Sequence, residues 1–325
     1  MKLVYIFADR HPENLRQLVR SQIPDSEFEV IPMSYSEPIE EQIKKFADAE
    51  AAFFAPGRFL DDRVIEAGKR MKLMQLWSSG YDKFNIAASQ EFGVPVANNG
   101  GANKIAVAEH TMLLILSIYK RIIDSHQRTV TGNWAGNSHG MDMFTLYNKT
   151  VGLIGLGNIG LEVARRCRAF GTKVLYFDKQ RRGIGEEYIE GVEFASIDRI
   201  LEEADIISPH LHYSTETENI INADSIAKMK QGAVIINVSR GELVDTDAVL
   251  DALESGQLGG AGFDVYRQEP TKAGDPLLEH PKVICTPHMA CTYDTHVMAL
   301  KASMANLLRA KRGEALQWIV NGVYR

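Results

Sequence analysis

Three glycines, Gly155, Gly157 and Gly160, constrain the fold of this chain more than any other feature. They follow the apolar run Val151–Ile154, and the third of them lies in the first turn of a helical pattern over Ile159–Phe170. In a strand–turn–helix unit of this kind, the first glycine permits a tight turn and the second lets the backbone approach a ligand closely. The third lets the helix pack against the strand. The motif therefore predicts one βα unit of a parallel sheet.

An acidic residue completes the pattern. Asp178 directly follows the next apolar run, Lys173–Phe177, at about the 20-residue offset expected of a dinucleotide-binding unit. Free N–H groups at a helix N-terminus bind phosphates, and a carboxylate in this place accepts hydrogen bonds from ribose hydroxyls. The pattern predicts NAD binding, with NADP less favoured because the carboxylate repels a 2′-phosphate. The cations Lys179, Arg181 and Arg182 leave NADP open, since they could attract that phosphate.

Strand and helix signals alternate from Thr150 onward. Short Val/Ile-rich runs without a two-residue pattern are typical of parallel strands buried on both faces. Glycines Gly171, Gly232 and Gly256 stand where helix C-caps are expected. The unit is predicted to be a Rossmann doubly wound sheet. Its strands are expected at Val151–Ile154, Lys173–Phe177, Asp205–Ser208, Ala233–Val238, Ala261–Val265 and Val283–Thr286, and its helices at Ile159–Phe170, Ile197–Glu203, Ala223–Lys230 and Asp247–Ser255.

A second α/β domain is expected from the remaining residues. The first hundred residues also alternate strand and helix signals, while the last 35 or so are too few to fold alone. A helical pattern over Thr295–Arg312 is expected to return to the N-terminal part. The predicted architecture is an NAD-binding Rossmann domain, residues 99–291, inserted into a flavodoxin-like substrate-binding domain formed by residues 1–98 and 292–325.

Composition narrows the class of protein. The 325 residues carry 36 Lys and Arg against 42 Asp and Glu, a net charge of −6, which argues against nucleic acid as a partner. No apolar stretch reaches the roughly 18–20 residues that span a bilayer, so no membrane association is expected. The first apolar run stops at Asp9 without a signal-peptide cleavage site. Three cysteines without a CxxC pair favour a reducing compartment, and we expect a cytoplasmic protein.

One segment, residues 105–123, is apolar nearly all round and should be buried. Two interpretations remain open for it: a helix of the core, or a helix in a subunit interface.

Three polar residues follow strand ends on one edge of the predicted sheet. Arg240, Glu269 and His288 come after the fourth, fifth and sixth strands, and ligands bind at the carboxyl ends of such strands. An arginine there can hold a carboxylate with two parallel hydrogen bonds. Taken singly, Arg240 could form a surface salt bridge and His288 could be structural; their shared edge favours a catalytic site.

With the glycine motif, Asp178 and these three polar residues, the chain resembles the D-isomer-specific 2-hydroxyacid dehydrogenase family. The resemblance covers nearly the whole chain and is densest over Thr150–Ala290, especially in Lys228–Val249, KMKQGAVIINVSRGELVDTDAV. It implies hydride transfer between NAD(H) and a D-2-hydroxy acid or its 2-oxo acid.

The resemblance also implies residue roles. Arg240 is expected to bind the substrate carboxylate, His288 to act as general acid/base, and Glu269 to favour the protonated imidazole. Backbone amides of the loop Ser78, Ser79 and Gly80 are expected to hold the same carboxylate. Asp264 is expected to hold the nicotinamide carboxamide. The full set of expected cofactor contacts is Gly155, Gly157, Asn158, Ile159, Gly160, Asp178, His210, Leu211, Thr217, Val238, Ser239, Arg240, Asp264 and His288.

The same resemblance places Ala108–His110 in the family's dimer interface, so a homodimer through residues 105–123 is expected. Two other functions stay open. A formate dehydrogenase shares the Arg and His but pairs its His with Gln, so Glu269 counts against it. A non-catalytic NAD(H)-sensing corepressor could keep all three residues.

Some positions depart from the family pattern. Met289, Ala290 and Cys291 follow His288 where small residues are frequent, and Gly100–Ala102 stand where several D-lactate enzymes carry aromatics. His212 replaces a common proline. No metal site is expected, because His210 and His212 have no suitably spaced third ligand. The identity of the 2-hydroxy acid stays open, as does a phosphate contact from Arg58 or Arg63.

Overall fold

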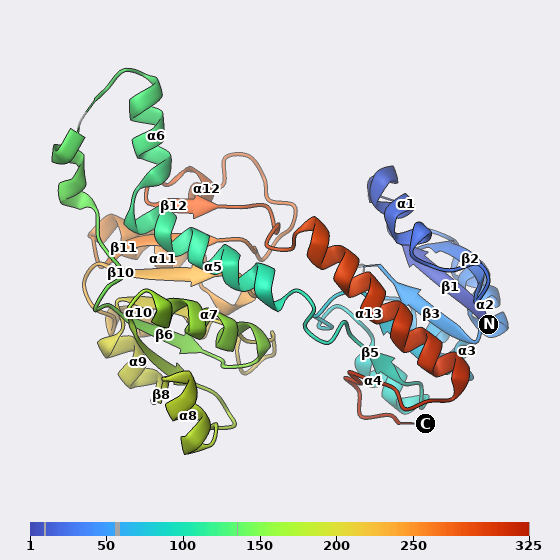
Figure 1. The fold of residues 1–325 in the computed structure, drawn as a ribbon. Helices are drawn as coiled ribbons and strands as arrows, with labels where there is room; N and C mark the ends of the chain where they lie inside the picture. The colour runs from blue at the N-terminus through green and yellow to red at the C-terminus, as the bar shows by residue number, and fades with distance from the viewer. Residues whose placement is uncertain (10, 56–58, 135, 325) are drawn as a thin grey trace. The chain divides into compact units, whose positions relative to one another are not determined.

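The computed structural model describes residues 1–9, 11–55, 59–134 and 136–324 (Figure 1). The chain divides into two compact units. Unit 1 comprises Met1–Asn103 and Thr292–Arg325, and unit 2 comprises Lys104–Cys291. The chain thus leaves unit 1 after Asn103, five residues beyond the boundary expected from the sequence, and returns to it after Cys291.

Unit 1 is built on a five-stranded parallel sheet with the strand order β2-β1-β3-β4-β5, which is the flavodoxin-like order. Strands β3 and β4 are buried along their whole length, β3 as an unbroken apolar run and β4 with the polar Gln75 among its apolar residues. The strands are β1 (Lys2–Phe7), β2 (Glu29–Ser34), β3 (Ala51–Phe54), β4 (Leu73–Leu76) and β5 (Val96–Ala97), and the helices between them are α1 (Glu13–Ser21), α2 (Ile39–Asp48), α3 (Asp62–Ala67) and α4 (Ile86–Glu91).

The C-terminal segment completes unit 1. Helix α13 (Tyr293–Arg312) buries Leu300 and Leu307 in one apolar cluster with Leu3 and Phe53 of the sheet. Beyond the helix, Ile319 forms an antiparallel bridge with Ala97 of β5. The end of the chain therefore covers the sheet and extends its edge.

Unit 2 is a seven-stranded parallel sheet with the order β12-β11-β10-β9-β6-β7-β8, which confirms the predicted Rossmann doubly wound fold. The chain reverses direction across the sheet between β6 and β9, and ligands bind at such a switch point. The strands are β6 (Thr150–Ile154), β7 (Lys173–Phe177), β8 (Glu193–Phe194), β9 (Ile206–Pro209), β10 (Ala233–Asn237), β11 (Leu258–Phe263) and β12 (Val283–Cys285), and the helices are α5 (Lys104–Tyr119), α6 (Ile122–Val130), α7 (Asn158–Ala169), α8 (Ile184–Glu190), α9 (Ile197–Glu203), α10 (Ala223–Ala227), α11 (Thr246–Ser255) and α12 (Pro276–Glu279), with 3-10 turns at Gly136–Asp142 and Gly241–Leu243.

The sequence suggested a single helix over the apolar segment 105–123, but the structure has two helices there. Helix α5 ends at Tyr119, Arg121 adopts a left-handed conformation with φ 47°, and α6 begins at Ile122. Most of α5 is buried against α7 and the strands β10–β12, although Leu113 is 55% exposed. Within the described residues, no helix combines the length and the apolar character that a membrane crossing demands.

One predicted helix cap is also wrong. Helix α10 ends at Ala227, and Lys228 is its C-cap, so Gly232 does not cap it. Gly232 instead adopts a positive φ of 80° and donates its N–H to the Gln257 carbonyl at 2.8 Å, which turns the chain into β10. Gly256 does cap α11, with φ 79°.

Candidate active site

The glycine-rich turn joins β6 to α7. Gly155 has φ 103°, and a Cβ on it would lie 2.5 Å from the His210 carbonyl oxygen. A Cβ on Gly160 would lie 2.3 Å from the Gly155 carbonyl oxygen. The protein's own packing therefore requires both glycines.

Gly157 is different. Apart from Gly157 itself and its two chain neighbours, no described atom lies within 4 Å of the position that its Cβ would take, so its missing side chain leaves open space. That space adjoins the N-terminus of α7, where Gly157 is the N-cap and Asn158 and Ile159 begin the helix. Unpaired N–H groups and the helix dipole make such a place suitable for the pyrophosphate of a dinucleotide. The turn thus fits NAD.

Asp178, directly after β7, holds this turn in place. Its Oδ2 accepts the N–H of Leu156 at 2.7 Å, and the Arg182 guanidinium donates to the Leu156 carbonyl at 2.9 Å. The neighbouring cations have partners. Arg181 donates twice to Glu187, at 2.9 Å each, and Lys179 forms an ion pair with Glu216.

The residues after β9 form a tight turn. Burial lowers the pKa of His210 to about 4, so its imidazole is neutral at pH 7, and its Nε2 lies 3.1 Å from Ser208 Oγ. The Thr217 hydroxyl accepts the Ser214 N–H at 2.8 Å and lies 3.0 Å from the His212 carbonyl. Leu211 packs partly buried against the core of unit 2.

The end of β10 carries three of the expected site residues. Val238 is buried, and the Ser239 hydroxyl donates to the Pro209 carbonyl at 2.8 Å, which joins the ends of β10 and β9. Arg240 is half-buried, and its guanidinium donates to the Ser239 carbonyl at 2.7 Å. The Asn237 side chain fixes the backbone of Arg240 with a 2.8 Å hydrogen bond to its carbonyl.

His288 and Glu269 lie in direct contact after β12 and β11. His288 Nδ1 is 2.8 Å from Glu269 Oε2, and Glu269 Oε1 accepts the Tyr266 N–H at 3.0 Å. The His288 side chain is 53% exposed and that of Glu269 is 26% exposed. The carboxylate thus orients the ring and leaves Nε2 as the nitrogen that a ligand can reach.

His288 also has an unusual backbone. Its φ is 53°, in the left-handed region that non-glycine residues seldom occupy and that costs on the order of 1–3 kcal/mol. Strain of this kind persists where surrounding contacts enforce it, and it is frequent at active sites.

The contacts that enforce this conformation converge on Asp264, which is fully buried. Its carboxylate accepts the Thr286 hydroxyl at 2.6 Å and the N–H groups of Met289 at 2.9 Å and Ala290 at 3.0 Å. His110 of α5 lies behind this group, an arrangement that the sequence did not reveal because its only visible signal was the apolar helix around it.

In unit 1, the loop Ser78–Gly80 follows β4. Ser78 Oγ donates to the Gly80 carbonyl at 2.7 Å, and Ser79 Oγ lies 2.6 Å from the side-chain oxygens of Asn99 and Asn103. Asn98 donates to the Ser79 carbonyl at 2.9 Å. The asparagines were missed from the sequence, which offers no spacing that would connect them to the loop.

Gly100 shows why this linker is small. It has φ 66°, and a Cβ on it would lie 2.3 Å from the indole of Trp318. The aromatic ring of the C-terminal tail therefore occupies the space that a side chain at Gly100 would need. Among the other unusual residues, Met289 is 55% exposed and Cys291 is half-buried.

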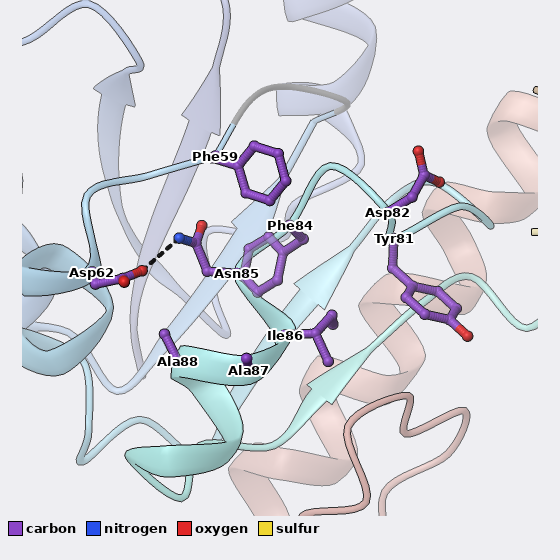
Figure 2. A pocket seen from close by; sticks show the side chains of 9 residues that line it. All are labelled: Phe59, Asp62, Tyr81, Asp82, Phe84, Asn85, Ile86, Ala87 and Ala88. Atoms are coloured by element: carbon purple, nitrogen blue, oxygen red, sulfur yellow. Dashed lines mark hydrogen bonds between the residues drawn. The ribbon is translucent and has the colours of Figure 1, made fainter. Parts of the chain in front are cut away.

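A hollow of about 430 Å³ lies between α3 and α4, next to Tyr81 and Asp82, which follow the Ser78–Gly80 loop. Figure 2 shows its aromatic side chains, including Phe59 and Phe84, and the 2.7 Å hydrogen bond from Asn85 to Asp62. Its carboxylates, on Asp62 and Asp82, disfavour an anionic ligand. Arg63 of α3 pairs with Asp61 at 2.9 Å, and Arg58 lies outside the described residues.

Comparison with known proteins gives the same family as the sequence motifs. Residues 112–290 match the family model for the D-isomer specific 2-hydroxyacid dehydrogenase, NAD binding domain. A glyoxylate reductase of Thermofilum pendens is 34% identical over 285 residues, which cover 87% of this chain and 84% of that protein.

Two solved structures are similar over nearly their whole length. The D-lactate dehydrogenase of Lactobacillus jensenii with NAD+ is 28% identical, with a TM-score of 0.80 and coverage of 98% of this chain and 99% of that one. A Granulicella formate dehydrogenase is 25% identical, with a TM-score of 0.85 and coverage of 98% and 96%. The chain therefore belongs to the D-isomer specific 2-hydroxyacid dehydrogenase family and is an NAD-dependent oxidoreductase.

Proposed function

We propose that this enzyme interconverts a small 2-oxo acid and the corresponding D-2-hydroxy acid, with Arg240, Glu269 and His288 as its catalytic residues. The observation that carries the proposal is the 2.8 Å contact between His288 and Glu269. It lies at the carboxyl ends of adjacent strands, and Arg240 follows the next strand of the same sheet.

Each side chain has a defined task in this proposal. NAD(H), when bound, supplies the hydride chemistry. His288 gives its Nε2 proton to the oxygen on C2 during reduction and takes it back during oxidation. Glu269 orients the His288 ring through the 2.8 Å contact with Nδ1, so that Nε2 faces the substrate. Arg240 binds the carboxylate with its planar fork and polarises the carbonyl.

The loop Ser78–Gly80 is proposed to add backbone amides to the carboxylate site, which makes unit 1 the substrate-binding domain. The hydroxyls of Ser78 and Ser79 bond within unit 1, which supports a role for the main chain here. This part of the proposal rests otherwise on the family resemblance.

The cofactor is proposed to be NAD in preference to NADP. Asp178 would accept hydrogen bonds from the ribose, and the ion pairs of Lys179 and Arg181 make those cations less available to a 2′-phosphate. The other proposed contacts are those expected from the sequence: Gly155, Gly157, Asn158, Ile159, Gly160, His210, Leu211, Thr217, Val238, Ser239, Arg240, Asp264 and His288.

The direct test is NADH oxidation with glyoxylate, hydroxypyruvate, pyruvate, phenylpyruvate and 3-phosphohydroxypyruvate, repeated with NADPH. The glyoxylate reductase of Thermofilum pendens makes glyoxylate the first candidate. We expect turnover with at least one of these acids and a higher kcat/KM with NADH. No turnover with any of them would contradict the proposal and favour a protein that only binds NAD(H).

Formate oxidation is the second candidate, because the Granulicella formate dehydrogenase is similar in fold and sequence. Oxidation of formate releases no hydroxyl proton, so it has no use for the His288–Glu269 pair. NAD+ reduction with formate, at a rate above that with 2-hydroxy acids, would reverse this ranking.

We further propose a cytoplasmic homodimer that associates through the region beginning with α5. Leu113 of α5 is 55% exposed, Ile123 and Val130 of α6 are 60% and 62% exposed, and Met141 is 82% exposed. An apolar surface of this kind favours burial against a second copy of the chain.

A further inference from the structure

His110 is a buried ionisable side chain that the proposed mechanism does not use. It is 8% exposed and lies in α5, far along the sequence from the strands that carry the catalytic residues. Its ring nevertheless contacts Thr286 and Asp264, both of which hold the loop of His288. All of these residues belong to unit 2.

The donor and acceptor roles around the Thr286 hydroxyl can be assigned from its neighbours. The Thr286 hydroxyl has a single proton, which goes to Asp264 Oδ1 at 2.6 Å because a bond to a carboxylate is the strongest available. The same hydroxyl oxygen lies 2.9 Å from His110 Nε2 and therefore accepts a hydrogen bond from it. His110 Nε2 is also 3.5 Å from Asp264 Oδ1. The imidazole thus orients the hydroxyl toward the carboxylate.

Asp264 also holds the backbone on the C-terminal side of His288. It accepts the N–H groups of Met289 and Ala290, while Thr286 precedes His288 by two residues. The loop is consequently held on both sides of His288, whose strained φ of 53° requires such support.

We infer that His110 is a positioning residue for the reaction. It orients the Thr286 hydroxyl and the Asp264 carboxylate, and these keep loop 286–290 in the conformation that places the His288 ring against Glu269. The inference rests on the proposed role of His288. His110 itself touches no reacting atom.

The first test compares three variants of the full chain by kcat, by KM for the 2-oxo acid and by the dissociation constant for NADH. His110→Leu should lower kcat by about 10- to 100-fold, because small displacements of a catalytic group have effects of this size. The dissociation constant for NADH should change far less than kcat, because the glycine turn and Asp178 are untouched. His110→Gln, which keeps an N–H donor on a side chain of similar reach, should recover most of kcat.

Thr111→Val is the matched control. Thr111 is fully buried in the same helix, but its hydroxyl donates to the Val107 carbonyl of α5 and not to the His288 loop. It should keep the wild-type kcat. A folded His110→Leu variant with wild-type kcat would overturn the inference, as would equal losses in His110→Leu and Thr111→Val. If His110→Leu does not fold, Thr286→Val is judged by the same criteria, with Thr286→Ser as its conservative partner.

A double-mutant comparison separates positioning from general structural support. In a His288→Ala background, His110→Leu should not lower the residual rate further, since the group that it positions is absent. The same fold-loss in both backgrounds would contradict the inference. His288→Ala with a wild-type rate would contradict the proposed function itself, whereas an unaffected His110→Leu contradicts only the role of His110.

Discussion

Two kinds of residue make up the proposed site in unit 2: those proposed to contact a ligand, and those that hold the first kind in place. The His288 ring is oriented by Glu269, whose second carboxylate oxygen is bound to the Tyr266 N–H, so neither side chain rotates freely. Arg240 receives comparable support from Asn237 through its own carbonyl. Preorganisation of this kind reduces the reorganisation needed when charge develops on a substrate oxygen.

Arg240→Lys tests the arginine's planar fork. We expect kcat/KM for the 2-oxo acid to fall by about 10- to 100-fold, because one lost charge-assisted hydrogen bond costs roughly 1.5–3 kcal/mol. Steady-state kinetics measure the effect. Arg199→Lys, in a surface ion-pair group with Glu193 and Glu203, is the control and should behave as wild type. Equal kinetics for both variants would remove Arg240 from the site.

His210 gives a prediction about pH and stability. Its folded-state pKa of about 4 lies below the ordinary value of 6.5, because burial disfavours the charged ring. Between these two values the unfolded chain binds a proton that the folded chain does not, so the free energy of unfolding decreases as pH falls from 6.5 toward 4.

The contribution between pH 7 and pH 5 is roughly 2 kcal/mol at 1.36 kcal/mol per pKa unit. Urea unfolding of the wild type and of His210→Gln at both pH values measures it. The wild type should lose more stability than the variant on acidification. Identical losses would mean that His210 titrates normally in the folded protein.

Elements with a regular pattern of buried apolar residues were the easiest to predict from the sequence. Strand β7 and helix α9 match the predicted ranges, since a continuous apolar run or a regular periodicity directly reflects their burial. Strand β8 and helix α8 were missed: the strand has two residues, and the helix exposes Ile184, Tyr188 and Ile189. The break at Arg121 has no local signal, because Lys and Arg are good helix formers.

The glycines of the β6–α7 turn allow a matched comparison. Gly160→Ala places a Cβ 2.3 Å from the Gly155 carbonyl and should destabilise the fold by about 1–3 kcal/mol, as overpacking does. Gly157→Ala meets no protein atom and should keep the wild-type Tm. It should instead weaken NADH binding by about 10-fold, or 1.4 kcal/mol.

Thermal unfolding and NADH fluorescence titration separate the two effects. Tight NADH binding by a folded Gly157→Ala variant would mean that the cofactor does not approach this residue.

At the scale of the whole chain, the sequence predicted more about reaction class than about substrate. The positions of Arg240, Glu269 and His288 after strand ends were readable because parallel strands end at one edge. The support of the Ser78–Gly80 loop by Asn98 and Asn99 was not readable, because it depends on contacts between distant segments. The same holds for Trp318 over Gly100, a contact that the linker sequence alone cannot reveal.

The proposed homodimer is a property of the whole molecule that one substitution can test. Ile123→Glu should shift the enzyme from dimer to monomer, because it introduces a charge into an exposed apolar surface that a partner would bury. Analytical ultracentrifugation of the wild type and the variant at matched concentrations measures this. Ile184→Glu, on the equally exposed α8, should leave the dimer intact. A monomeric wild type, or a dimer unaffected by Ile123→Glu, would contradict the proposed interface.

The most direct test of the account is the turnover of His288→Ala with NADH and the preferred 2-oxo acid. Loss of the general acid/base should lower kcat by about 10²- to 10⁴-fold. The variant should still bind NADH, because the glycine turn and Asp178 are untouched. A folded variant that binds NADH and turns over at the wild-type rate would contradict the central claim that His288 transfers the proton.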